Sequence, residues 1–294
     1  MVRLLVLIIN KGVNMIKVGD RFENTRGSEY VVVEYLNYEK ITVEFCDEHK
    51  YRVIKGGDCV KSGNIKNPYA PLLFGVGYHG VGPHKSKAGS TKKGFASLPA
   101  YSAWTNMLSR CYDKNYLDPH LYENSEVHPD WHCFQTFADW YYDKLKIAEW
   151  EGRKCLDKDI LGDGTIYSPE TCCLVPASIN RSISKLHGGK YLPGVLKSSN
   201  GLYGVVPGYG FDKTNFETEL EAHLAFLVAK QKKIIDLANK YKSWLNPRVY
   251  DMLCTKDFRF KFSPFYKWLK QKFFFKSIPT LQKPSGVSKS KFWI

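Results

Sequence analysis

The sequence has no pair of cysteines spaced as CxxC, although it contains eight cysteines. Their spacing is irregular, and the one close pair, Cys172 and Cys173, is vicinal, a placement that rarely forms a bridge. Paired spacings mark most zinc sites and secreted disulfide frameworks. We therefore expect reduced thiols in a cytoplasmic protein, and a zinc site built from scattered cysteines is disfavoured.

Long hydrophobic runs are also missing. Residues 3–9 (RLLVLII) resemble the core of a signal peptide, but no small-residue cleavage site follows. The run is far too short to span a bilayer. Met15 opens the segment MIKVGDRF, which looks like a natural start. We therefore expect residues 1–15 to be an upstream extension of the reading frame, with a core-packing strand as the alternative.

Acidic residues are scarce near the C-terminus. Residues 255–294 hold ten Lys/Arg and one acid, Asp257, whereas the preceding residues hold 33 Lys/Arg and 28 Asp/Glu. The overall charge of +14 favours a polyanionic partner, usually nucleic acid. This basic tail interleaves aromatic side chains with lysines. The tail could bind nucleic acid, a membrane surface or a groove on a host protein. It could also be an altered end of the reading frame, and the sequence leaves these alternatives open.

The chain is long enough for two or three small domains, with 294 residues. Within residues 16–66, apolar residues alternate with polar ones and predict strands at 30–35, 40–45 and 51–54. Short strands in quick succession suggest a small β-barrel-like domain. Residues 67–98 are rich in glycine and lysine and predict a linker. Its lysines either contact the phosphate backbone of a nucleic acid or are only solvated.

Two amphipathic helices are predicted in the middle, at residues 99–111 and 134–145, because apolar side chains recur there every three or four residues. Their aromatic residues are expected in the core. Residues 155–185 follow with a strand at 156–161, a loop at 162–169, a strand at 171–175 and a helix at 177–185.

The last globular segment predicts a three-stranded sheet and a helix. Strands are expected near 194–196, 202–206 and 209–215, and Asn200-Gly201 is a strong hairpin signal. Thr218 and Glu221 form a capping-box pattern that opens a helix running to about residue 242, and a short helix follows at 247–253. The expected fold class is α+β. Its expected segments are 1–15, 16–66, 67–98, 99–187, 190–254 and 255–294.

Three blocks carry a resemblance to a phage-encoded family. They are VGDRF to GVGYHGVG near the start, YSAWTNMLSRCY, VHPDWHCFQTFADWY, LDKDI and YSPETCCLVPASIN in the middle, and LPGV with FETELEAHLAFLVAKQKKIIDLA near the end. The middle is similar to HNH-type endonucleases, which have a helical ββα-metal domain. The end resembles the Apetala-type (ethylene-response-factor-like) DNA-binding domain. The resemblance covers about residues 16–254 and implies a homing or nicking endonuclease that binds double-stranded DNA.

The HNH resemblance implies an active site that holds a divalent metal ion, Mg²⁺, although some of the residues usual in the family are replaced here. Asp157 matches the metal-binding acid, and Asn180 matches the metal ligand on the helix. Lys158 stands where the family has its general-base histidine, and Thr171 where an asparagine orients that histidine. A lysine of ordinary pKa cannot easily accept a proton near pH 7. Asp157, Lys158, Asp159 and Asn180 are the candidate catalytic residues, with Asp157 and Asn180 as metal ligands.

Two explanations stay open for this site. In the first, Asp157, Asp159 or Asp163 binds Mg²⁺ through oxygen atoms, and His128 or His132 supplies the base. In the second, the HNH-like segment at residues 155–185 is catalytically inactive and keeps only the fold with which it binds DNA.

The Apetala-type resemblance implies sheet-borne Arg and Trp that read the major groove. Here Leu196 falls near an expected Arg and Tyr203 near an expected Trp, which favours contacts with the DNA backbone over base readout. The candidate DNA contacts are Lys185, Lys197, Tyr203 and Lys213. The alternatives are a purely structural sheet, or an interaction protein that binds a host factor through its tail. No small-molecule cofactor is indicated, a membrane partner is disfavoured, and the host-cell cytoplasm is the expected location.

Overall fold

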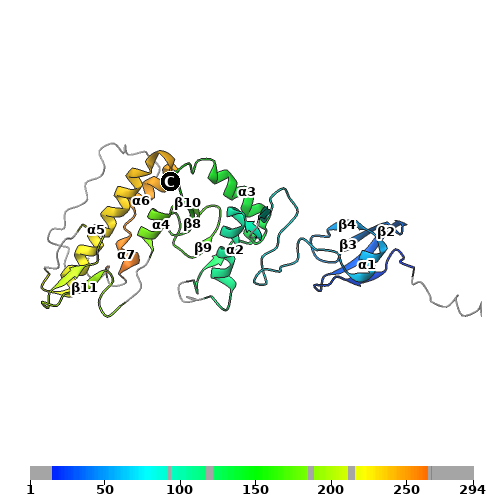
Figure 1. Cartoon of the computed structure of the whole chain (residues 1–294), viewed down its shortest axis with the longest axis horizontal. Coiled ribbons are helices and arrows are strands. Elements are labelled where there is room, and N and C mark those ends of the chain that lie inside the picture. The colour runs from blue at the N-terminus through cyan, green and yellow to red at the C-terminus, as the bar shows by residue number, and fades with distance from the viewer. Residues whose placement is uncertain are drawn as a thin grey trace, which may run out of the picture. The chain divides into compact units, whose positions relative to one another are not determined.

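The computed structural model describes residues 15–91, 94–116, 122–184, 189–210, 216–263 and 266. The chain divides into two compact units. Figure 1 shows the helices and strands of the chain, coloured by residue number. Unit 1 comprises residues 1–146 and 162–172, and unit 2 comprises residues 147–161 and 173–294. Helices and several small sheets occur together, so the α+β class is confirmed. The proposed upstream extension lies outside the described residues, apart from Met15.

The first part of unit 1 is an antiparallel sheet of four strands in the order β1-β2-β3-β4. The strands are β1 (Arg21–Glu23), β2 (Glu29–Asn37), β3 (Lys40–Phe45) and β4 (Arg52–Lys55), followed by α1 (Gly57–Ser62). Tyr30, Val32, Ile41 and Val43 are fully buried and pack with Val60 of α1. Within residues 15–66 no strand pairing joins β1 to β4, so the expected barrel does not close. The short helix covers the apolar side, so closure is not needed to bury it.

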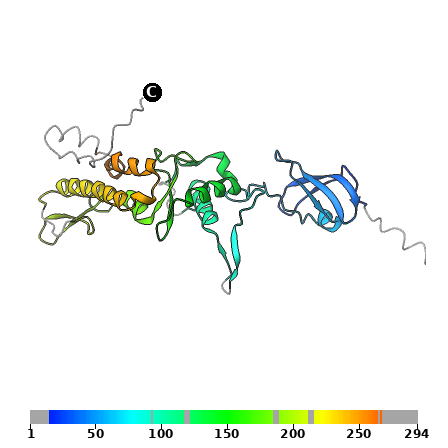
Figure 2. The same cartoon turned by 90° about the horizontal axis from the view of Figure 1, so that it is seen from above.

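The segment predicted as a linker carries an antiparallel hairpin, β5 (Lys87–Thr91) and β6 (Gly94–Ser97). Figure 2 shows its two strands extending away from the neighbouring helices. The residues before the hairpin are held by Gln135, whose Oε1 accepts the His84 N–H at 2.9 Å and whose Nε2 donates to the His84 carbonyl at 3.0 Å. A Cβ at Gly82 would lie 2.4 Å from the Gln135 Oε1. That glycine therefore permits close packing within the protein.

Both predicted middle helices are confirmed, as α2 (Pro99–Tyr112) and α3 (Phe134–Leu145). The 3-10 helix η2 (Pro129–His132) lies just before α3. Trp104, Trp131 and Phe134 are buried, and the Trp104 indole N–H donates to the Trp131 carbonyl at 2.7 Å. Strand β7 (Glu126–Val127) pairs in parallel with β9 (Ile166–Tyr167). The aromatic residues thus form core, as expected.

Unit 2 begins with the finger-like segment. Strand β8 (Lys154–Asp157) pairs antiparallel with β10 (Cys173–Pro176), and α4 (Ala177–Ile183) follows directly. The first strand was expected to reach residue 161 but ends at Asp157. There the carboxylate of Asp157 accepts backbone N–H groups and turns the chain.

The second part of unit 2 is a hairpin packed on a long helix. Strands β11 (Val195–Lys197) and β12 (Tyr203–Val205) are joined through Gly201, whose φ is +85°. Thr218 and Glu221 form the predicted capping box of α5 (Glu219–Lys240). The 3-10 helix η3 (Lys242–Trp244), α6 (Pro247–Thr255) and α7 (Arg259–Phe262) follow. Residues 211–215, most of the expected third strand, lie outside the described residues, and Phe216 bridges antiparallel to Tyr203.

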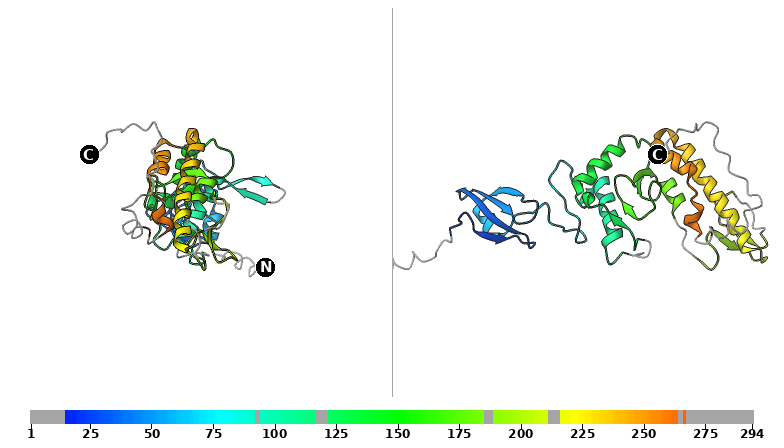
Figure 3. Two further views of the ribbon diagram at one scale, coloured as in Figure 1. Left: turned by 90° about the vertical axis from the view of Figure 1, so that its left-hand side faces the viewer. Right: turned by 180° about the vertical axis from the view of Figure 1, so that it is seen from behind.

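The core of unit 2 extends past the expected boundary at residue 254. Phe226 and Ile234 of α5 share one buried cluster with Phe258, Phe262 and Tyr266. Figure 3 shows α6 and α7 beside α5. The start of the basic tail is therefore part of this unit. In the described part of the chain, no helix combines the length and the apolar character needed to cross a bilayer.

Replacing Gly194 with alanine should destabilise unit 2. Gly194 has a φ of +80°, and a Cβ there would lie 2.3 Å from the ring of Phe226. Left-handed strain and overpacking together should cost about 2–4 kcal/mol of unfolding free energy. Gly201→Ala is the matched control, because Gly201 has a similar φ but no atom within 4 Å of the added Cβ. Urea unfolding measures both, and equal losses would contradict the close contact with Phe226.

Candidate functional site

Asp157 lies at the end of β8 and is buried, with an exposed fraction of 6%. Its Oδ1 accepts the backbone N–H groups of Asp159 and Ile160, both at 2.9 Å. Burial raises the pKa of this carboxyl, and the neighbouring Asp159 raises it further. The side chain expected to bind metal therefore closes the turn after the strand.

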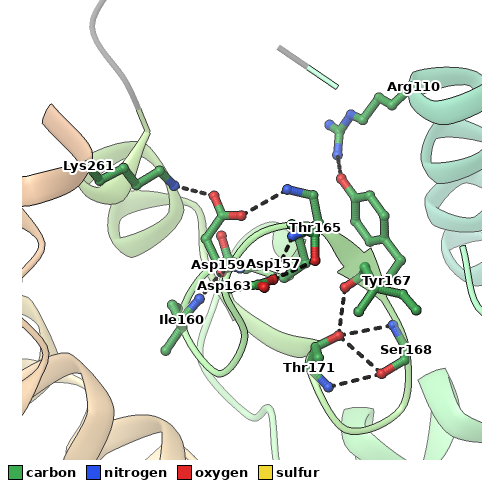
Figure 4. A network of polar contacts seen from close by, with 12 residues as sticks. Arg110, Asp157, Asp159, Ile160, Asp163, Thr165, Tyr167, Ser168, Thr171 and Lys261 are labelled. Atoms are coloured by element: carbon green, nitrogen blue, oxygen red, sulfur yellow. Dashed lines mark hydrogen bonds and ion pairs between the residues drawn. The ribbon is translucent and has the colours of Figure 1, made fainter. Parts of the chain in front are cut away.

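Asp159 is the centre of an ion cluster. Its Oδ2 accepts from the Lys261 ammonium (Figure 4). Its Oδ1 accepts from the Lys158 ammonium at 2.9 Å. Burial opposes ionisation, but Lys261 and Lys158 outweigh it and lower the pKa of Asp159. Lys158 is itself buried. The Lys158 ammonium is therefore paired with Asp159 within the protein, at the position where the resemblance would place a general base.

The segment at residues 256–262, which we call the clasp, holds the same turn from the other side. The Lys256 ammonium donates to the carbonyls of Asp159 at 2.7 Å and Ile160 at 3.3 Å. The amide of Gln231 on α5 binds the clasp backbone at both Lys256 and Phe258. The clasp therefore fixes the finger-like segment to α5.

Lys230 on α5 is a fully buried lysine that was not among the residues predicted from the sequence. Its ammonium donates to the Ser184 carbonyl at 3.0 Å and lies 3.9 Å from the ring centroid of Phe262. Burial lowers its pKa to about 8, helped by the charge of Lys261. The sequence contains a signal for this burial. Lys230 lies four residues from both Phe226 and Ile234, so it falls on the apolar face of the helix.

The two predicted metal ligands do not fit a divalent ion. Asp157 uses its Oδ1 on two backbone N–H groups, and Asn180 on α4 contributes no charge. Mg²⁺ and Ca²⁺ favour several oxygen ligands with net negative charge, whereas two ammonium groups neutralise Asp159 here. Among the described residues, no three His, Cys, Asp or Glu side chains are grouped so as to hold a metal ion.

The residues of the displaced-site hypothesis have local partners as well. Asp163 Oδ1 accepts from the N–H and hydroxyl of Thr165, at 2.9 and 2.6 Å. His128 Nδ1 accepts the Asp130 N–H at 3.4 Å. His132 is half-buried, which lowers its pKa. Asp163 and both histidines belong to unit 1, whereas Asp157 and Asp159 belong to unit 2.

Thr171 closes the loop between β9 and β10. Its hydroxyl donates to the Ile166 carbonyl at 2.7 Å and accepts the Ser168 N–H at 3.1 Å. Within the same unit, the Tyr167 hydroxyl accepts from Arg110 at 3.4 Å (Figure 4). Burial raises the pKa of Tyr167. These contacts stabilise a loop. None of the eight cysteines, which all lie in the described part of the chain, forms a disulfide.

Two of the predicted DNA contacts meet across the hairpin. Lys197 and Tyr203 are cross-strand partners, and the Lys197 ammonium lies 4.8 Å from the Tyr203 ring centroid. Because side chains alternate along a strand, both share the face of the buried Val195 and Val205. Lys197 is exposed on that face, and Tyr203 is half-buried. Lys185 and Lys213 lie outside the described residues.

A second Lys-Tyr pair beside them was missed. Lys190 lies 5.7 Å from the Tyr191 ring centroid, and the Tyr191 ring meets the Tyr203 ring edge-on at 6.0 Å. We call Lys190, Tyr191, Lys197 and Tyr203 the hairpin patch. The stretch 189–210 has no Asp or Glu, and that absence was readable in the sequence.

The positive charge is concentrated in unit 2. This unit holds 24 Lys/Arg against 11 Asp/Glu, whereas unit 1 holds 19 against 18. The residues of the basic tail beyond 263 account for seven of the 24. Unit 2 therefore remains basic without them.

Comparison with known proteins adds no family to this description. No family model matches the chain, and neither a curated protein nor a solved structure matches it.

Proposed function

We propose that this chain binds double-stranded DNA through unit 2, and that its HNH-like segment supports the fold without cutting DNA. The observation that carries the proposal is the hairpin patch, an acid-free row of lysines and tyrosines in the basic unit. The phage-type HNH and Apetala-type resemblances point to the same partner.

Binding in this proposal works through the phosphate backbone. The Lys190 and Lys197 side chains are exposed, and among the described residues no carboxylate lies within ion-pair distance of either ammonium. Lysines that neutralise phosphates release counterions, so affinity falls steeply with salt. Leu196, where a base-reading Arg is expected, carries no hydrogen-bond donor on its side chain. Sequence preference should accordingly be weak.

The absence of cutting in this proposal rests on how the acids are used. Asp157 is buried and caps a turn, and Asp159 is neutralised by Lys158 and Lys261. A hydrolytic site needs an ionised ligand or base that is available to metal and water. Metal-dependent cleavage by the same segment is the competing proposal.

One assay separates the two proposals. Purified full-length protein is mixed with supercoiled plasmid in Mg²⁺, Mn²⁺ or EDTA, and both mobility shift and nicking are read. We expect a shift in all three and nicking in none. Metal-dependent nicking that Asp157→Ala abolishes would establish the endonuclease instead. Nicking unchanged in that variant would also contradict our proposal and would place the cutting residues elsewhere.

The contribution of the hairpin patch is tested by the double variant Lys190→Gln, Lys197→Gln. We expect about tenfold weaker binding at low salt and a salt slope smaller by about 2, one for each lost phosphate contact. Lys40→Gln is the control, since Lys40 is an exposed lysine of unit 1. Fluorescence anisotropy with a labelled duplex over a salt series measures both. Equal slopes for the two variants would remove the patch from DNA binding.

The role of the tail needs a deletion that begins after the core. Removing residues 255–294 would also remove Phe258, Phe262 and Tyr266 and so disrupt unit 2. A deletion of residues 267–294 keeps those side chains. DNA affinity that survives this deletion would separate the tail from DNA binding and leave it for a host factor.

A further inference from the structure

A second acid-free basic stretch lies at the far end of α5. Residues 239–250 contain Lys240, Lys242 and Arg248 and no Asp or Glu. Lys240 lies 5.5 Å from the ring centroid of Tyr241, and Lys242 lies 5.0 Å from that of Tyr250. We call the cationic and aromatic side chains of this end the C-terminal patch. Its cations and its one tryptophan are exposed, and its two tyrosines are half-buried. Its members are Lys240, Tyr241, Lys242, Trp244, Arg248 and Tyr250.

The cations of the C-terminal patch are available to a ligand. Among the described residues, no carboxylate lies within ion-pair distance of Lys240, Lys242 or Arg248. Other lysines of unit 2 are already engaged: Lys232 pairs with Asp236 at 2.8 Å, and Lys261 pairs with Asp159. Exposed cations beside aromatic rings in an acid-free stretch suit a polyanion.

The C-terminal patch is also held in place. The Tyr250 hydroxyl donates to Asn239 Oδ1 at 2.8 Å, and Ser178 donates to the Tyr241 hydroxyl at 3.4 Å. Asn246 caps α6 by accepting the Arg248 N–H at 2.9 Å, and Leu245 is buried in the core of the unit. The patch needs little ordering before it binds, which lowers the entropic cost of association.

The hairpin patch is anchored at the opposite end of the same helix. The Glu219 carboxylate accepts the Leu192 N–H, and the His223 ring meets the Pro193 carbonyl at 2.8 Å. Helix α5 has 22 residues. At 1.5 Å per residue, the helix separates the anchors of the two patches by about 30 Å. One turn of B-DNA advances by about 34 Å.

We propose that the two patches bind the backbone of one duplex at two places about one helical turn apart. The inference rests on the proposed DNA binding and adds a second contact and a minimum duplex length to it. Helix α5 acts as a rigid spacer between the contacts. Linking two weak contacts in this way raises the affinity only when both reach the same ligand.

A duplex length series tests this two-point binding. Blunt duplexes of about 6, 14 and 24 base pairs bracket one turn of DNA. For the wild-type protein we expect affinity to rise steeply between the first two lengths. The variant Lys240→Gln, Lys242→Gln should bind the long duplexes about tenfold more weakly and the shortest one normally. Lys232→Gln is the matched control, because Lys232 lies on α5 between the patches and is paired with Asp236.

Circular dichroism first establishes that each variant is folded. A Lys240, Lys242 variant that binds every duplex like wild type would overturn the two-point inference and leave DNA binding intact. Failure of the wild type to bind duplexes of any length would overturn DNA binding and this inference together. Sedimentation of that wild type with anionic phospholipid vesicles would then assign the patches to a membrane.

Discussion

Replacing Asp159 with asparagine should lower the free energy of unfolding by about 3 kcal/mol at pH 7, because it leaves two largely buried ammonium groups without their counterion. The carboxylate binds Lys158 and Lys261, and their side chains are only 9% and 23% exposed. The nearly isosteric amide keeps the shape of the turn and removes its charge. Urea unfolding of the full chain measures the loss.

Asp143→Asn is the control for this prediction. Asp143 also pairs with two lysines, Lys144 and Lys146, but on the exposed surface of α3. Exposed pairs contribute little, so we expect almost no change. The pKa of Asp159 is lowered in the folded protein. Its stabilisation is therefore complete above its unfolded pKa of about 3.9 and is lost as the pH falls through the lowered folded value. Equal losses in the two variants would contradict the ion cluster.

Replacing Lys230 with methionine should flatten the alkaline part of the stability profile. The folded pKa of Lys230 is about 8, whereas an unfolded lysine titrates near 10.4. A lowered folded pKa means that burying the charged form is costly below pH 8. The wild type should therefore gain stability between about pH 8 and 10.4, by about 3 kcal/mol. The methionine variant has no group to titrate there and should not show this gain.

Urea unfolding between pH 7 and 10 measures the difference, with Lys232→Met as the control. Lys232 is exposed and paired with Asp236, so its removal should leave the profile parallel to that of wild type. Parallel profiles for wild type and Lys230→Met would contradict the lowered pKa. Lys230→Met is expected to fold, since methionine fills similar volume among Phe226, Phe262 and their neighbours.

Elements with local signals were predicted well from the sequence. The start of α5 follows from Thr218 and Glu221, and the β11–β12 turn follows from Asn200-Gly201. Helices α2 and α3 follow from the spacing of their aromatic residues. In each case the signal lies within a few residues of the structure it specifies, so no distant contact is needed to read it.

The candidate site could not be read in the same way. Lys261 and Asp159 are 102 positions apart, and no local pattern announces their pairing. The HNH resemblance drew attention to Asp157 at a strand end, yet it could not tell that Oδ1 accepts two N–H groups there. The length of the first strand was overestimated for the same reason. A side chain's partners depend on the assembled fold, which a motif match does not describe.

Unit 1 is made of two separate stretches of the chain, which limits how the protein can be cut into fragments and how its gene can recombine. Residues 162–172 return to unit 1, where β9 pairs with β7 and Tyr167 contacts Arg110. A fragment ending at Lys146 lacks residues 162–172, and one beginning at Ile147 carries them without β7 and Arg110. Neither unit corresponds to one uninterrupted stretch of the gene. A recombination event with a single crossover therefore cannot exchange unit 2 without also cutting unit 1, so the two units should descend together.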